Sequence, residues 1–168
     1  MKPTTSRCAS AAAVALLALG TACSDARDPL SPKLQAWNQP PPPQTGELSG
    51  VGMIRSSMDE VTFTFDVTSD ATGVHGRFSA VDGTGSTLNA TAFSAFRSTS
   101  GFCATPSHGA EFDATGTLVE AGVASTVTFT VKACDNGPAI VGMDTFSIDI
   151  PSHSFHEQGT VVGDIQKR

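Results

Sequence analysis

The sequence predicts an all-β domain of about eight antiparallel strands in a meander, closed as a small up-and-down barrel, with a two-sheet β-sandwich as the alternative. Three observations lead to this prediction. Apolar and polar residues alternate with a period of two in repeated runs between residues 50 and 166. Clusters of Gly, Asp, Asn and Ser separate these runs. No interval between them is long enough for a crossover helix, so neighbouring strands should pair as hairpins.

The alternation is clearest where Val61, Phe63, Phe65 and Val67 are interleaved with two threonines and an aspartate. One face of such a strand is apolar and the other is polar. The predicted strands cover residues 50–56, 60–68, 73–81, 86–97, 109–119, 124–134, 143–150 and 159–166. Eight meandering strands leave two unpaired edges, and pairing the first strand with the eighth removes both.

The fourth predicted strand is irregular. Leu88, Ala90 and Ala92 keep one phase of the alternation, but Phe93 and Phe96 fall out of step with them. A β-bulge inserts an extra residue and re-aims the side chains that follow it. The pattern therefore predicts a bulge near Ala92.

The start of the chain is predicted to be a bacterial lipoprotein signal. Lys2 and Arg7 precede an apolar run over residues 11–19, which is too short to span a bilayer. Three small residues then precede Cys23, where lipoprotein processing attaches a diacylglycerol to sulfur. We therefore expect a cell-envelope protein that is lipid-anchored to a bacterial membrane through Cys23. The alternative is ordinary cleavage after Ala22, which would leave a secreted or periplasmic protein.

A proline-rich segment follows the signal. It carries Pro29, Pro32 and the run 40–43, and it lacks sustained apolar periodicity. Proline fixes φ and donates no hydrogen bond, so this segment is predicted to be an extended, solvated tether. The chain is accordingly divided into a signal peptide (1–22), a Pro-rich tether (23–46) and a single β domain (47–168).

The charge of the mature chain limits its partners. Loss of Lys2 and Arg7 with the signal reduces the 10 basic residues to 8 against 16 acidic ones, a net charge of −8. Nucleic acids and anionic lipid surfaces need clustered Lys and Arg, which this chain lacks. The expected partners are the membrane, through the N-terminal lipid, and an envelope protein of unknown identity, without nucleic acid and without a cofactor.

Several segments of the domain resemble a known family. These segments are Gly50-Val51-Gly52-Met53-Ile54, Thr128-Phe129-Thr130-Val131 running into Asp135-Asn136-Gly137-Pro138, Asp144-Thr145-Phe146-Ser147-Ile148, and Gly159-Thr160-Val161 to Asp164-Ile165-Gln166. Together they are similar to the post-COAP domain family of secreted bacterial and archaeal proteins, over about residues 46–167. The resemblance implies an all-β extracytoplasmic module and adds no chemistry, because no activity is established for that family.

Two cysteines belong to the β domain, Cys103 and Cys134. Successive strands of a meander run in opposite directions, which brings both cysteines to the same end of the domain. An oxidising compartment favours a disulfide between them. Strands that are neighbours but one lie about 9.5 Å apart, so the loop over residues 98–108 must fold over the end of the fifth strand to close the bond.

One loop is a weak candidate for a metal site. Asp135, Asn136 and Asp144 bracket a cluster of oxygen donors, with Glu111 and Asp113 on a neighbouring strand. A hard cation such as Ca²⁺ takes six to eight oxygens, which this loop could supply in part. The favoured interpretation is structural, because Asp and Asn in turns bond their own backbone. No metal is predicted.

The four histidines are not predicted to carry chemistry. His153 and His156 are three residues apart, which could suit a metal on a helical turn, but they are interpreted as surface-loop residues. His75 is expected on the polar face of its strand, and neither His75 nor His108 is assigned a role.

Motifs of catalysis are absent from the sequence, which has no G-x-S-x-G, no H-E-x-x-H and no phosphate-binding glycine loop. The leading hypothesis is a non-enzymatic structural or interaction module. The alternative is a carrier of a small apolar ligand inside the barrel, and an enzyme is the least favoured reading. Phenylalanines that fill the interior would argue against the carrier, and a cavity of a few hundred Å³ would favour it.

Overall fold

The computed structural model describes residues 44–55, 59–99, 101–137 and 143–168. The chain divides into two units, residues 1–40 and 41–168, and the second contains the β domain. The predicted signal peptide, Cys23 and nearly all of the tether lie outside the described residues. The strands are β1 (Gly46–Arg55), β2 (Glu60–Asp70), β3 (Gly73–Asp82), β4 (Thr87–Ser98), β5 (Gly109–Glu120), β6 (Val123–Cys134), β7 (Thr145–Ile150) and β8 (Phe155–Lys167). Short 3₁₀ turns, η1 (Pro106–His108) and η2 (Pro151–His153), precede β5 and β8.

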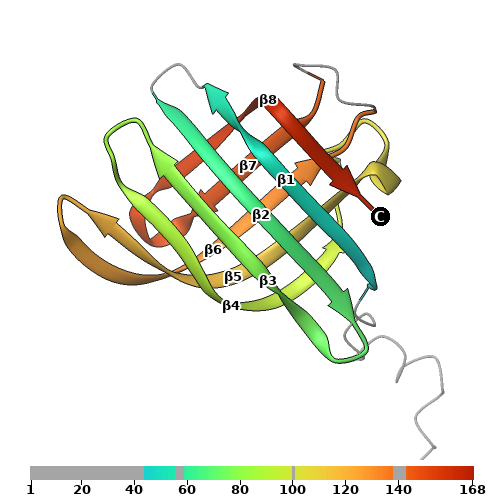
Figure 1. Ribbon diagram of the computed structural model, residues 1–168, viewed down its shortest axis with the longest axis horizontal. Coiled ribbons are helices and arrows are strands. Elements are labelled where there is room, and N and C mark those ends of the chain that lie inside the picture. The colour runs from blue at the N-terminus through green and yellow to red at the C-terminus, as the bar shows by residue number, and fades with distance from the viewer. Residues whose placement is uncertain (1–43, 56–58, 100, 138–142) are drawn as a thin grey trace, which may run out of the picture. The chain divides into compact units, whose positions relative to one another are not determined.

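The eight strands form a closed antiparallel barrel in simple sequence order (Figure 1). Its seam is the pairing of β1 with β8, in which Gly52 lies opposite Gly163. A Cβ at Gly163 would lie 2.2 Å from the carbonyl oxygen of Val51, so the two backbones approach closely enough to require glycine there. The barrel prediction is confirmed, and the sandwich alternative is excluded because β1 and β8 pair with each other.

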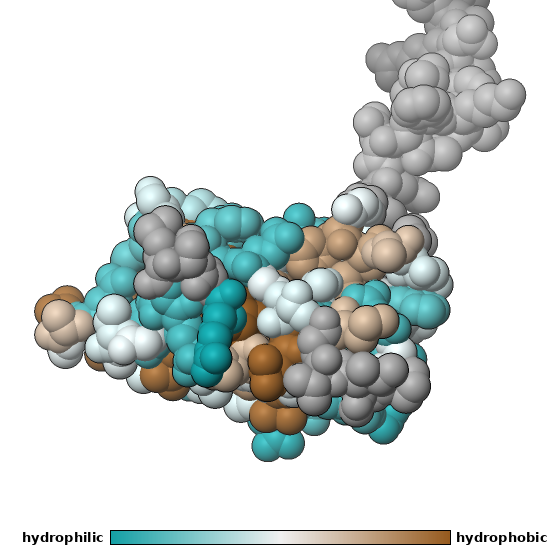
Figure 2. Space-filling model, turned by 90° about the horizontal axis from the view of Figure 1, so that it is seen from above, coloured by the Kyte–Doolittle hydropathy of each residue, from teal (hydrophilic) through white to brown (hydrophobic). Residues whose placement is uncertain are grey.

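Buried and exposed side chains alternate along the strands as the sequence predicts. In β2, Val61, Phe63, Phe65 and Val67 are buried, and the threonines between Val61 and Phe65 are exposed. Most other strands repeat this pattern over at least part of their length, and the core is a single apolar interior enclosed by the sheet. Hydrophilic residues cover much of the face in Figure 2, with hydrophobic patches between them.

Two bulges, not one, bend β4. The register with β5 shifts between Ala90 and Ala92 and again between Phe93 and Ala95, which leaves Thr91 and Ser94 as the extra residues. Each extra residue uses its hydroxyl to donate to a carbonyl of β5, at 3.1 Å for Thr91 and 3.4 Å for Ser94. The inward positions of β4 therefore step by three at each bulge, and this step returns Phe96 to the core.

Strand β8 begins at Phe155, four residues before the predicted start. Its first part carries Glu157 in the phase that later holds Val161, so apolar alternation is missing there. Pairing with β7 alone forms this part of the strand, because β1 pairs with β8 only from Val161 onward. His156 consequently lies on a strand, and its interpretation as a loop residue is wrong.

The two ends of the barrel differ. At the first, called the closed end, β1 begins and β8 ends, and the loop before β5 folds across (Figure 1). There Glu47 and Arg168 exchange backbone hydrogen bonds of 3.0 and 2.9 Å. At the second, called the open end, lie the β3–β4 and β5–β6 turns, together with the end of β7 and the start of β8. The open end is therefore opposite to the point at which the chain enters the barrel.

Candidate binding site at the open end of the barrel

Aromatic rings fill the barrel interior. Seven buried phenylalanines of the described residues contribute to it: Phe63, Phe65, Phe78, Phe96, Phe112, Phe129 and Phe146. The rings of Phe63 and Phe146 stack with centroids 3.9 Å apart, and those of Phe78 and Phe129 lie 5.1 Å apart. Such close packing of the rings differs from that of barrels that enclose a small molecule.

The closed end is sealed by the disulfide between Cys103 and Cys134, whose Cα atoms are 5.6 Å apart. The predicted disulfide is present, and the loop before β5 lies over the start of that strand to make it. Gly109 lies directly under it, because a Cβ there would be 1.9 Å from the sulfur of Cys103. The hydroxyl of Thr99 donates to the same sulfur at 2.9 Å. These contacts hold the loop before β5 against the closed end of the barrel.

The acidic loop beside the disulfide also serves the fold. Asp144 is buried, and its two oxygens accept the backbone N–H groups of Asn136 at 2.9 Å and Ile165 at 2.8 Å. Asp135 accepts N–H groups of Gly137 and Lys167 in the same way. Of the three weak metal candidates, Asp135 and Asp144 thus bind backbone N–H groups of β8, and the Asn136 side chain donates to the carbonyl oxygen of Met143.

Glu111 and Asp113 do not join this loop. They face outward from β5, where Arg97 binds both, with its Nη1 2.7 Å from Asp113. Hydrogen bonds from Arg97 and Thr130, and the nearby positive charges, hold the pKa of Asp113 below its usual value against the opposing effect of partial burial. Within the described ranges, no group of three His, Cys, Asp or Glu side chains is arranged to hold a metal ion.

His153 and His156 contact different carboxylates. His153, in η2, lies 3.8 Å from Glu120, and His156 lies 3.4 Å from Asp149, its partner across β7 and β8. His75 is exposed on the outer face of β3, as predicted. The two closely spaced histidines therefore meet different carboxylates.

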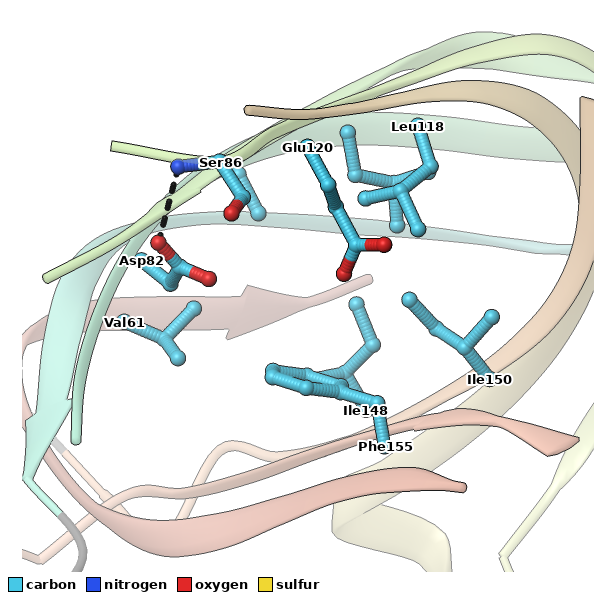
Figure 3. A pocket seen from close by; sticks show the side chains of 10 residues that line it. Val61, Asp82, Ser86, Leu118, Glu120, Ile148, Ile150 and Phe155 are labelled. Atoms are coloured by element: carbon cyan, nitrogen blue, oxygen red, sulfur yellow. Dashed lines mark hydrogen bonds between the residues drawn. The ribbon is translucent and has the colours of Figure 1, made fainter. Parts of the chain in front are cut away.

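At the open end the apolar interior is accessible from outside through a pit of about 20 Å³, room for about one water molecule (Figure 3). Its apolar wall includes Val61, Leu88, Leu118, Ile148, Ile150 and Phe155.

Two carboxylates, Asp82 and Glu120, line the mouth of the pit, and Figure 3 shows both turned toward it. Strand alternation puts them there. Asp82 follows buried Ala80 by two residues on β3, and Glu120 follows buried Leu118 by two residues on β5. Both acids therefore occupy the inward phase at the last position of their strands. The sequence analysis did not predict this pair. The pattern that could have indicated it is an acidic residue at the end of a strand, in phase with the apolar residues of that strand.

The two carboxylates differ in their surroundings. Oδ1 of Asp82 accepts hydrogen bonds from the backbone N–H groups of Thr84 and Ser86, both at 2.9 Å, and from the Thr84 hydroxyl at 2.7 Å. Partial burial acts to raise the pKa of Asp82, but these hydrogen bonds outweigh it and hold that pKa below its ordinary value. The side chain of Glu120 is 50 % exposed. Its carboxylate lies 3.8 Å from the ring of His153, which is too far for a hydrogen bond.

A second hollow, the lateral groove, lies on the outer face of the barrel. It has a volume of about 400 Å³ and is lined by Arg97, Glu111, Lys132, Asp149 and His156, among others. Its basic and acidic groups are paired with one another. Arg97 and Lys132 both contact Glu111, and His156 contacts Asp149. Because its groups already satisfy each other, the lateral groove is a weaker candidate than the pit.

No protein-family model, no curated protein and no solved structure matches this chain. In the part of the chain that the structure describes, no helix has the length and apolar character needed to cross a membrane.

Proposed function

We propose that this protein is a lipid-anchored binding module of the bacterial cell envelope that presents the open end of a filled barrel to a partner. The observation that carries the proposal is the packed interior. The core phenylalanines stack against one another, and the pit admits only about 20 Å³. A carrier of a small apolar molecule needs a cavity of several hundred Å³, so an exposed end is the better candidate for recognition.

The proposal is for binding and not for catalysis. Three hydrogen bonds commit Asp82 to its own turn, and its lowered pKa makes it a poor proton donor at neutral pH. The post-COAP resemblance supports the same proposal, since it implies an extracytoplasmic β module without established chemistry.

The position of the open end also supports this role. The chain enters the barrel at the closed end, so a tether attached there leaves the opposite mouth accessible. The proline-rich composition of the tether favours an extended spacer between lipid and barrel.

Lipidation has a direct test. In Cys23→Ala the protein is expected to leave the membrane fraction, because two acyl chains on that cysteine would be its stable anchor. Fractionation of cells and the mass of the mature N-terminus measure this. Cys8→Ala is the matched control, since Cys8 is expected to leave with the signal peptide. Membrane association that survives Cys23→Ala, or an N-terminus without lipid mass, would refute the anchor.

The use of the open end is tested by photocrosslinking in intact cells. A benzoylphenylalanine at Val123, which is 70 % exposed on the β5–β6 turn, should give one adduct of defined mass. The same group at Ala104, exposed on the closed-end loop, should not. Equal adducts from both positions, no adduct from Val123, or a small apolar molecule found in the native mass spectrum would contradict the proposal and, in the last case, favour the carrier.

A further inference from the structure

The pit combines an apolar wall with carboxylates at its mouth, and this combination points to one kind of partner. We infer that the open end binds a protein segment in which an aliphatic side chain is flanked by basic residues. The aliphatic tip would enter the pit, and the flanking cations would lie beside Asp82 and Glu120. This inference rests on the proposed function and adds the chemistry of the partner.

The apolar part of the contact follows from the size and lining of the pit. A space of about 20 Å³ takes one methyl group at the end of an aliphatic side chain and not a whole ring or acyl chain. Its wall is aliphatic on most sides, with Leu118, Ile148 and Ile150 among the contacts that a methyl group would make. Val123 adds an exposed apolar surface beside the mouth, where it pairs with Glu120.

The charged part of the contact follows from the bonding of the two carboxylates. Asp82 uses Oδ1 for the three hydrogen bonds of its turn, and the side chain of Ser86 is a further hydrogen-bond partner of this carboxylate. Glu120 has only the distant His153 as a charged neighbour among the described residues. Both carboxylates are turned toward the pit (Figure 3), so an ammonium or guanidinium group would be attracted there and an anionic segment would be repelled.

The overall charge favours the same partner. The mature chain is expected to carry a net charge of −8, which accelerates the approach of a basic segment and repels an acidic one. Because the two carboxylates are at the rim, the attraction should weaken as salt is added.

The test is an NMR titration of the ¹⁵N-labelled β domain within the full mature chain, at low salt, with three capped tripeptides: Lys-Val-Lys, Lys-Ser-Lys and Glu-Val-Glu. Lys-Val-Lys should shift the amide signals of Leu118, Ile150 and Phe155. Lys-Ser-Lys should bind about fourfold more weakly, because it has no methyl group to leave water and enter the pit. Glu-Val-Glu should show no saturable binding.

Two variants assign the charge effect. Glu120→Gln should weaken Lys-Val-Lys binding about two- to fivefold, the range for a solvent-exposed ion pair. Glu60→Gln is the matched control, because Glu60 lies near the same end of the barrel but faces outward and pairs with Arg55. It should leave the affinity unchanged.

The outcomes separate the inference from the proposed function. Equal affinity for Lys-Val-Lys and Glu-Val-Glu, equal losses in the two variants, or signal changes confined to other surfaces would overturn the inference. A specific photocrosslink from Val123 in that case would leave the open end as a binding surface for a partner of other chemistry. Selective binding of Lys-Val-Lys without any crosslink in cells would contradict the proposed function instead.

Discussion

Phe129→Ala lowers the free energy of unfolding by about 3–5 kcal/mol, the largest loss expected from a single substitution considered for this barrel. The ring is 2 % exposed and lies 5.1 Å from that of Phe78. The ring also packs against Gly116 on β5, where a Cβ would lie only 3.0 Å from it. Truncation therefore opens a cavity that the surrounding rings cannot fill without losing their own contacts.

Urea denaturation followed by far-UV circular dichroism measures this loss. Circular dichroism is the suitable signal, because the single tryptophan, Trp37, belongs to the predicted tether and the chain has no tyrosine. Thr128→Ala is the matched control. Thr128 is exposed on the outer face, opposite Thr115, and its loss should cost no more than about 0.5 kcal/mol. Equal losses at the two positions would mean that β6 is buried on both faces.

Replacement of both Cys103 and Cys134 by alanine is expected to cost about 3–4 kcal/mol, on the model in which a disulfide restricts the unfolded chain. The bond joins residues 31 positions apart and holds the loop before β5 against the end of β6. Both cysteines are replaced together so that no free thiol remains. The same denaturation experiment, run on the oxidised protein and on the double variant, measures the loss, and equal stability of the two would refute it.

Gly109→Ala tests whether the disulfide requires glycine beneath it. In the oxidised protein the added methyl group would collide with the sulfur of Cys103, at 1.9 Å, so a large loss of stability is expected. In the double alanine variant that sulfur is gone, and the loss from Gly109→Ala should be smaller, although the carbonyl oxygen of Ala133, 2.9 Å from the added carbon, still opposes it. An equal cost in both backgrounds would show that the disulfide is not the obstacle.

Local pattern was sufficient for much of the fold because β alternation is a property of neighbouring residues. Alternation in the sequence assigned Phe63 and Phe65 to the apolar face, and the break in phase at Phe93 indicated a bulge that the structure confirms. The second bulge and the early start of β8 were missed for a common reason. At Ser94 and at Glu157 the local signal is weak, and pairing with a neighbouring strand decides the conformation.

The sequence by itself determined which face of most strands is apolar, and which two cysteines the β domain has to pair. Only the tertiary structure decided that the sheet closes through β1 and β8, since a sandwich has the same alternation. It also decided that Asp82 and Glu120, from different hairpins, line one mouth above an apolar pit. The physical reason is that alternation acts between adjacent residues, whereas closure and the meeting of strand ends depend on the register of all eight strands together.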